Sequence, residues 1–334
     1  MISFAKHCSG SDHSGLLHTV AFGFRVFRHH LLRRRLTLQP TVSVVVPFFN
    51  RCSEVQPCLE SVLAQRLPDD APFEVIAVDN GSTDGTLDEL AKYPVRVVRC
   101  AVPGPAAARN AGIAAASGEV IAMIDSDATA QPGWLAALTA PFVRPDMLAV
   151  GGRVDSLSVV RGVELFAERA SVLNQRKFFS GVLGFPPFFA TCNVAYRRSA
   201  LEQVGGFDET LRVGEDSDLA WRVLDQGGCI AYAHGAFVRH AHRSTFVGLF
   251  TQALDYGTGA AQIFAKHRHR FGRRVSVQWH DFAGLALAPL NASRWLIFGT
   301  TPYERRLGLY EAVYRAGFTL GRLRGSLRHR VLFL

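Results

Sequence analysis

Residues 118–128 read GEVIAMIDSDA, and this stretch decides the fold. Its five apolar residues, 120–124, are followed without a spacer by Asp125, Ser126 and Asp127. A short apolar run bounded by a glycine and by charges is typical of a strand buried on both faces of a parallel sheet. Because unpaired burial of a carboxylate is costly, both aspartates must meet solvent or a cation at the end of this strand. Ligands bind at this edge of open α/β sheets, and a D-x-D pair supplies hard oxygen ligands for Mg²⁺ or Mn²⁺. A solvated turn is the alternative.

The composition indicates a globular protein with an acidic partner. The 334 residues are 48% hydrophobic and carry a formal charge of +9, enough chain for one large or two modest domains. The charge favours a nucleotide diphosphate, a phospholipid surface or a nucleic acid as partner. The six cysteines are scattered without a C-x-x-C pair, so we expect reduced thiols in a cytosolic protein. Lys6, His7 and other polar residues interrupt any secretory h-region at the start.

Strands and helices alternate along the first part of the chain. Apolar and β-branched runs predict strands at 41–47, 73–78, 95–100 and 120–124. Three helices are predicted between these strands. The first runs from an N-cap at Ser53 to about Gln65, and the second follows the turn-rich loop after 73–78 and ends at about Tyr93. The third is rich in alanine and follows the Pro-Gly-Pro turn at 103–105. Alternation at this spacing predicts an α/β fold with a doubly wound, mostly parallel sheet.

Six motifs, taken in order, resemble the family 2 glycosyltransferases of the GT-A fold. They are VVVPFFN, VDNGSTDGT, GPAAARNAG, IDSD, NVAYRRSALEQVGGFDE and GEDSDLAWRV, and the resemblance spans about residues 41–245. It implies the inverting transfer of a sugar from a nucleotide diphospho-sugar donor to a hydroxyl acceptor, assisted by Mn²⁺ or Mg²⁺. We therefore expect a GT-A domain at 41–245, a basic N-terminal arm at 1–40 and a helical, basic C-terminal extension at 246–334.

The resemblance implies donor-binding residues where the predicted strands end. Asp79 matches an aspartate that contacts the nucleobase, and the backbone of Pro47 with the side chains of Phe49 and Arg51 matches the nucleoside site. Arg109 lies near the start of a helix, where its guanidinium and the helix N-terminus both favour a diphosphate. From the residues alone, a turn-forming role for Asp79 and an ordinary surface position for Arg109 stay open.

Metal and catalytic residues also follow from the resemblance. Asp125 would face the donor ribose or sugar, and Asp127 would bind the cation that neutralises the leaving diphosphate. Asp216 matches the general base that a single displacement requires on the face opposite the leaving group. His240 would complete the metal shell, although His242 or a surface position for both remains an alternative. Imidazole suits Mn²⁺ better than Mg²⁺.

Two further aspartates in these motifs have structural interpretations. Asp84 lies deeper in the loop after the second predicted strand, and we expect it to stabilise a turn. Asp218 lies in the first turn of the helix that starts near residue 215, where the helix dipole favours a carboxylate.

The sequence disfavours other functions. A sugar nucleotidyltransferase usually has a glycine- and arginine-rich loop after its first strand, where this chain has VPFFNR. A catalytically silent nucleotide-sugar-binding protein would not need the set Asp125, Asp127 and Asp216. Polymerisation is disfavoured because residues 291–295 read NASRW instead of Q-x-x-R-W and no apolar run reaches about eighteen residues. No G-x-G-x-x-G follows the first strand, which excludes a dinucleotide oxidoreductase.

Basic and apolar residues are interleaved towards both ends of the chain. Arginines alternate with Phe and Leu at 21–38 and again at 305–330, a pattern that suits an anionic membrane surface. A solvated arm and a helix that closes the core are the alternatives. Because no nucleic-acid-binding motif accompanies the charge, we expect no nucleic-acid partner. The expectation is a cytoplasmic protein, peripheral on the cytoplasmic face of the membrane, that meets a glycan or lipid-linked acceptor.

Overall fold

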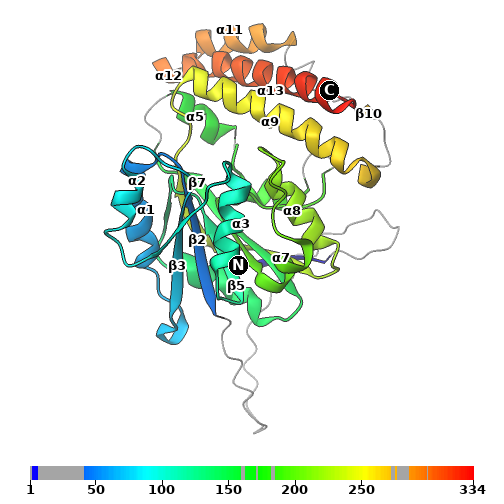
Figure 1. The fold of residues 1–334 in the computed structure, drawn as a ribbon. Helices are drawn as coiled ribbons and strands as arrows, with labels where there is room; N and C mark the ends of the chain where they lie inside the picture. The colour runs from blue at the N-terminus through cyan, green and yellow to red at the C-terminus, as the bar shows by residue number, and fades with distance from the viewer. Residues whose placement is uncertain are drawn as a thin grey trace, which may run out of the picture. The chain divides into compact units, whose positions relative to one another are not determined.

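The computed structural model describes residues 2–6, 41–158, 162–170, 172–181, 185–271, 275–276, 286–298 and 300–334 (Figure 1). The predicted basic arm therefore lies outside the described residues, apart from the strand β1 (Ile2–Lys6), which the sequence did not predict. The chain forms two units. The first contains Met1–Val154, Gln175–Phe207 and Leu219–Arg239, and the second contains Asp155–Asn174, Asp208–Asp218 and His240–Leu334.

A mixed β-sheet forms the centre of the first unit. In spatial order its strands are β1, β9 (Cys229–His240), β7 (Met147–Ser156), β8 (Asn193–Arg197), β5 (Val120–Ile124), β2 (Val42–Phe48), β3 (Phe73–Asp79) and β4 (Arg96–Arg99), with β6 (Ala128–Ala130) paired to β9. Strands β2 to β5 pair in parallel, whereas β8 runs antiparallel to both β5 and β7. The predicted α/β fold is confirmed, and its parallel part lies in the four strands that the sequence identified.

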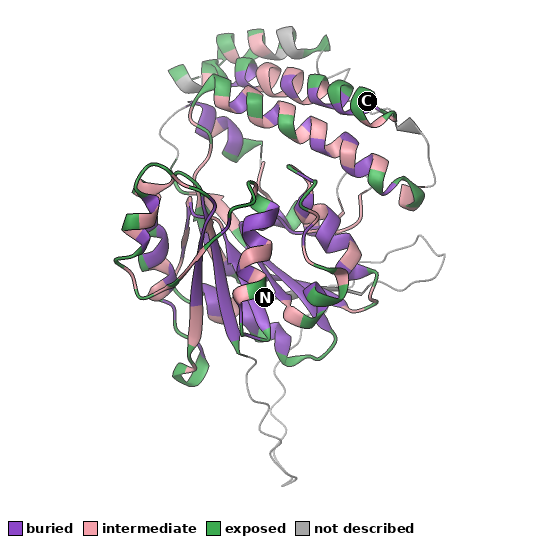
Figure 2. Cartoon of the chain, viewed as in Figure 1, coloured by how far each residue is buried: buried purple, intermediate pink, exposed green. Residues whose placement is uncertain are grey.

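Helices cover both faces of the parallel strands, which are buried (Figure 2). On one face, Val44 and Val46 of β2 share a core with α1 (Cys52–Leu63) and α4 (Trp134–Thr139). On the other, α3 (Pro105–Ala115) packs on β2 and β3. The approach is so close that a Cβ at Gly112 would lie 2.3 Å from Val45 Cγ1. This glycine therefore lets α3 lie directly on the sheet. The other α-helices described in this unit are α2 (Thr86–Leu90), α6 (Gln175–Phe179), α7 (Arg198–Val204) and most of α8 (Glu215–Leu224).

The start of α1 differs from the sequence prediction. Ser53 was expected to cap this helix, but α1 begins at Cys52, and the Ser53 hydroxyl instead donates to Glu54. The backbone N–H of Cys52 donates to the Asp84 carboxylate, and the N–H of the preceding residue, Arg51, donates to the Thr86 hydroxyl. The first donors of the helix are therefore satisfied by a distant loop instead of a local cap.

The second unit is mainly helical. Its described α-helices are α5 (Gly162–Arg169), α9 (Phe246–Lys266), α11 (Ala288–Phe298), α12 (Pro302–Arg305) and α13 (Leu307–His329), and β10 (Val275–Ser276) pairs in parallel with β11 (Leu332–Phe333). A small apolar cluster joins α5, α9 and α13 through Val163, Phe166, Leu249, Leu307 and Tyr310. Within the described part of the chain, no helix is long and apolar enough to cross a membrane.

A stripe of glycines joins α13 to α9. Gly317, Gly321 and Gly325 recur at every fourth position of α13. A Cβ on Gly321 would lie 2.1 Å from the carbonyl oxygen of Leu254, and one on Gly317 would lie 2.8 Å from that of Phe250. The two backbones therefore touch where side chains would normally intervene, as small residues allow.

We expect Gly321→Leu to force α9 and α13 apart. Overpacking of a close contact typically costs about 1–3 kcal/mol, so the urea midpoint of the second unit should fall. Leu320→Ala is a suitable control, because the neighbouring Leu320 is 50% exposed. Equal urea midpoints for the two variants would contradict this account of the glycine stripe.

Candidate functional site

The sheet order creates a switch point between β2 and β5. The chain continues from β2 to β3 and β4 on one side, whereas β5 pairs with the other edge of β2. Ligands of open α/β sheets bind outside the carboxyl ends of the strands at such a point. Arg51, after β2, and Asp127, after β5, meet here, with 3.4 Å between Arg51 Nη2 and Asp127 Oδ2. The strand ends that the sequence singled out therefore lie at one edge of the sheet.

Arg109 is buried and faces Asp125. Its Nη2 donates to Asp125 Oδ1 at 2.8 Å, and its side chain is only 6% exposed, against 26% for Asp125. The guanidinium carbon also lies 5.9 Å from the centre of the Phe207 ring. The alternative of an ordinary surface arginine is therefore wrong. A buried cation of this kind can compensate the charge of a carboxylate and of an incoming anion.

The residues after β2 border the same edge. Pro47 lies within β2 opposite Val78 of β3 and is half-buried. Phe49 is 58% exposed, and an exposed aromatic ring can stack on a nucleobase. Arg51 is half-buried and contacts Glu54 as well as Asp127, with each pair of atoms 3.4 Å apart. Apolar surface and positive charge are thus adjacent here.

Asp79 is buried at the end of β3. Its Oδ1 accepts a hydrogen bond from the Ser82 N–H at 3.3 Å, so the turn-forming role that the sequence left open is present.

The next residue, Asn80, is also buried and holds the segment before α3. Its side-chain nitrogen donates to the Val102 carbonyl at 2.7 Å, and its oxygen accepts from the Gly104 N–H at 2.8 Å. Asn80 was not among the predicted site residues, although its place in the VDNGS motif marks a turn.

Asp84 stabilises the loop after β3, as predicted. Its carboxylate accepts hydrogen bonds from the Thr86 hydroxyl and from the N–H groups of Thr86 and Cys52. The Thr86 hydroxyl is the main reason that the pKa of Asp84 lies below its usual value, and the Cys52 N–H comes next. The loop and the start of α1 are therefore held together by this carboxylate.

We expect Asp84→Ala to lower the melting temperature, because three donors lose their acceptor. A lowered carboxyl pKa contributes stability above the unfolded-state pKa of about 3.9, and that contribution disappears as the pH falls through the folded value. The difference in melting temperature between wild type and variant should therefore shrink in acid, as differential scanning calorimetry can measure. A pH-independent difference would contradict this role.

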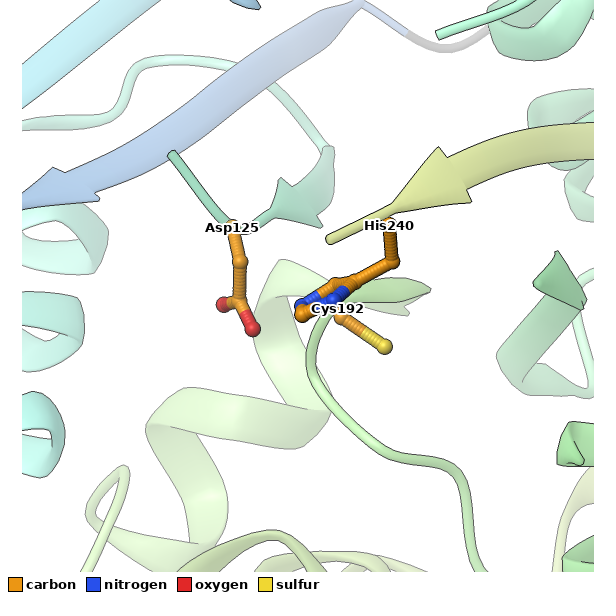
Figure 3. Close-up of side chains that lie close together, drawn as sticks. All are labelled: Asp125, Cys192 and His240. Carbon is orange, nitrogen blue, oxygen red and sulfur yellow. The ribbon is translucent and has the colours of Figure 1, made fainter. Parts of the chain in front are cut away.

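A candidate metal-binding group lies beside Asp125. Ligand atoms of Asp125, Cys192 and His240 all lie within 4.8 Å of one another (Figure 3). Cys192 is buried just before β8, and His240 is the last residue of β9, a continuous strand of the sheet. Cys192 was missed because the sequence offered only scattered cysteines without a pair. Asp127, the predicted ligand, lies outside this group in the described structure and contacts Arg51 instead.

The two candidate histidines have different neighbours. His240 Nδ1 lies 2.8 Å from the Ala241 carbonyl oxygen, which can only accept, so Nδ1 donates in this contact. A backbone carbonyl that holds the second ring nitrogen is typical of metal-binding histidines. His242 Nε2 lies 2.8 Å from the Ser156 hydroxyl. This geometry favours His240 over His242 as a ligand.

Cys58 lies beneath the aspartates but does not have the chemistry of a nucleophile. Its thiol is buried and lies 3.7 Å from the Asp125 carbonyl oxygen. Burial, followed by the negative charges of Asp127 and Asp125, raises the pKa of this thiol far above its usual value. The thiol therefore stays protonated and belongs to the core.

The predicted base, Asp216, lies in the first turn of α8. It is half-buried, and its Oδ1 accepts a hydrogen bond from the Ser217 N–H at 2.8 Å. Two residues later, Asp218 is fully buried and contacts Lys266 Nζ at 2.6 Å and His267 Nε2 at 2.8 Å. Asp218 thus ties the start of α8 to the end of α9, which confirms its structural interpretation.

The histidine in this tie has a defined tautomer. Arg270 Nε donates to His267 Nδ1 at 3.1 Å, so Nδ1 is the acceptor and Nε2 carries the hydrogen that Asp218 accepts. Asp218 therefore receives a hydrogen bond and a neighbouring positive charge from the same end of α9. A buried carboxylate needs such compensation.

Comparisons with a family model and with known proteins agree on one family. The model of the family described as glycosyl transferase family 2 matches residues 43–205. A pre-mycofactocin glycosyltransferase of Mycobacterium tuberculosis is 32% identical over 235 residues, which cover 68% of this chain and 48% of the relative. A glucosyl-dolichyl phosphate glucuronosyltransferase of Haloferax volcanii is 31% identical over 218 residues, which cover 60% of this chain and 68% of the relative. The chain thus spans about half the length of the mycobacterial relative.

The fold is also shared with a solved structure. The mannosyltransferase PcManGT of Pyrobaculum calidifontis, in complex with GDP-Man and Mn²⁺, has a TM-score of 0.58 and is 20% identical. The similarity covers 88% of each chain. At this level of identity the likeness is one of fold.

Proposed function

The chain belongs to glycosyl transferase family 2, and on this premise we propose that it is an inverting glycosyltransferase. It would move a single sugar from a nucleotide diphospho-sugar to a hydroxyl acceptor. The observation that carries the proposal is the pairing of Asp125 and Asp127, at the end of β5, with Arg109 and Arg51 at the switch point. Carboxylates and arginines interleaved at that edge can bind both a cation and a diphosphate.

The donor would bind along the carboxyl ends of β2, β3 and β5. The proposed donor-binding residues are Pro47, Phe49, Arg51, Asp79, Arg109 and Asp125. Phe49 offers an exposed ring to the base, and Arg109 offers a buried charge at the start of α3, where the helix dipole also attracts an anion. That PcManGT was solved with GDP-Man supports a nucleotide diphospho-sugar as the donor class.

A divalent cation would be held by Asp127 and His240, next to Asp125. The chemistry of these residues fits such an ion, because carboxylate oxygens are hard ligands and the Ala241 carbonyl holds Nδ1 of the His240 ring, which lies beside Asp125. Asp127, which contacts Arg51 in this structure, would turn from it to reach the ion. Imidazole favours Mn²⁺ over Mg²⁺, and the Mn²⁺ in the PcManGT complex supports the same choice. When bound, the ion would supply Lewis-acid neutralisation of the leaving diphosphate.

Asp216 would act as the general base. In a single displacement, the acceptor oxygen attacks the anomeric carbon as the bond to the diphosphate breaks, and the hydroxyl proton passes to the base. The hydrogen bond from the Ser217 N–H would favour the ionised carboxylate and fix its orientation. The tie between Asp218 and α9 would hold the helix turn that carries this carboxylate.

The acceptor would be a hydroxyl of a lipid-linked or cell-envelope glycan. The Haloferax relative is named for a dolichyl-phosphate-linked glucose, which supports a lipid-linked class. We accordingly propose that the protein works peripherally at the cytoplasmic face of a membrane.

A thermal-shift screen of nucleotide diphospho-sugars, with and without Mn²⁺, tests this function. The correct donor should raise the melting temperature most when Mn²⁺ is present, since ligand at 100 Kd adds about 2.7 kcal/mol of stability. Products then separate the alternatives. A glycosyltransferase releases a nucleoside diphosphate, a sugar nucleotidyltransferase uses or releases pyrophosphate, and a silent binding protein gives a shift without turnover.

A further inference from the structure

Exposed apolar side chains are concentrated in the second unit. Of the large apolar residues that are exposed in the described structure, all except Phe49, Val102 and Val143 belong to that unit. Scattered exposed leucines are ordinary, but a concentration on particular helices marks a surface that binds a partner.

The first such helix is α11. Leu287, just before it, and Leu290, Ile297 and Phe298 within it are 52%, 67%, 68% and 74% exposed. Leu290, Arg294 and Ile297 follow one another at intervals of four and three residues, which places them along one side of the helix with Phe298 next to them. These side chains, and Leu296 as well, stay exposed although α11 packs on α13, so that packing does not use them.

The second is the C-terminal half of α13. Leu320, Leu323 and Leu327 are 50%, 45% and 73% exposed and alternate with the exposed Arg324 and Arg328. The glycine stripe of the same helix contacts α9, so these leucines are not needed for that packing. Figure 2 shows exposed residues along both helices.

The charge of this region is almost entirely positive. Its exposed arginines are Arg294, Arg305, Arg306, Arg324, Arg328 and Arg330. The only acidic residues between 286 and 334 are Glu304 and Glu311, which are half-buried and paired with Arg169 and Arg315. Long apolar side chains among exposed arginines match a surface that is anionic outside and apolar beneath, which is the interface of a bilayer.

We propose that α11 and the C-terminal half of α13 form a membrane-binding face that takes an anionic bilayer. The apolar side chains enter the boundary of the acyl chains, and the arginines contact the lipid phosphates. This membrane-binding face deepens the proposed function. It depends on that function only for the identity of the acceptor. The sequence also predicted a contribution from Arg33, Arg34 and Arg35, which lie outside the described residues.

Vesicle flotation of the full chain tests the proposal. Vesicles of phosphatidylcholine alone are compared with vesicles of equal parts phosphatidylcholine and phosphatidylserine. We expect flotation with the anionic vesicles at low salt and release as salt shortens the range of the attraction. Arg324→Gln with Arg328→Gln should weaken partitioning roughly 30-fold, which corresponds to about 2 kcal/mol. Leu290→Ser with Ile297→Ser should weaken it at least about tenfold.

The control is Arg99→Gln with Val143→Ser, which removes an exposed arginine and an exposed apolar residue from the first unit. It should float like wild type, and circular dichroism should be alike for all variants. Three results would overturn the proposal: no flotation with either vesicle at low salt, equal flotation with neutral vesicles, or self-association that the same substitutions abolish. Donor turnover is measured separately, so its loss would count against the proposed function and not against the membrane-binding face.

Discussion

Asp216→Asn is expected to reduce turnover by about 10²–10⁴-fold while donor and metal binding stay unchanged. The amide keeps the size of the side chain but cannot take the proton of the acceptor hydroxyl. Because binding precedes proton transfer, calorimetric titration with donor and Mn²⁺ should give wild-type affinities. Turnover near the wild-type value would remove Asp216 from the mechanism.

Asp218→Asn is the matched control for this variant. It lies two residues later on the same helix, where its carboxylate is buried between Lys266 and His267. Breaking a buried ion pair typically costs about 3–5 kcal/mol, so this variant should lose stability. Its folded fraction should still turn over substrate at a rate far above that of Asp216→Asn.

Asp127→Ala is expected to abolish the dependence of donor binding on metal. The substitution removes a proposed ligand and also leaves Arg51 without the carboxylate that it now contacts. Residual donor binding through that arginine is therefore expected, but Mn²⁺ should no longer strengthen it. Calorimetry with and without Mn²⁺ measures this linkage directly, and unchanged metal-linked affinity would refute the assignment.

Asp84→Ala is the control for Asp127→Ala. Its carboxylate is bound to the loop and to the start of α1, so it should lower stability without changing metal-linked donor affinity. Loss of the linkage in both variants would mean that damage to the loop, and not loss of a ligand, explains the effect.

Local sequence patterns were sufficient for the parallel half of the sheet. The predicted strand at 120–124 matches β5 residue for residue, because a short apolar run between a glycine and two aspartates fits a buried strand and few other kinds of segment. Asp218 and Asp84 were likewise interpreted from their positions at a helix start and in a turn.

Features that depend on distant partners could not be predicted in this way. The start of α1 is capped by Asp84 and Thr86, more than thirty residues away, whereas the local sequence pattern favours Ser53. Cys192 comes beside Asp125 because β8 pairs antiparallel with β5, and no spacing in the sequence reports that pairing. The β1 strand depends on the edge of β9 in the same way.

The stereochemistry of donor cleavage tests the central claim most directly, and it needs no knowledge of the acceptor. The full chain is incubated with an α-linked nucleotide diphospho-sugar and Mn²⁺, with water as a slow acceptor, and the first sugar released is followed by proton NMR. Inverting transfer predicts that the β-anomer appears first, together with a nucleoside diphosphate, and that Asp216→Asn suppresses both. Early release of the α-anomer, or of a sugar phosphate, would contradict the account.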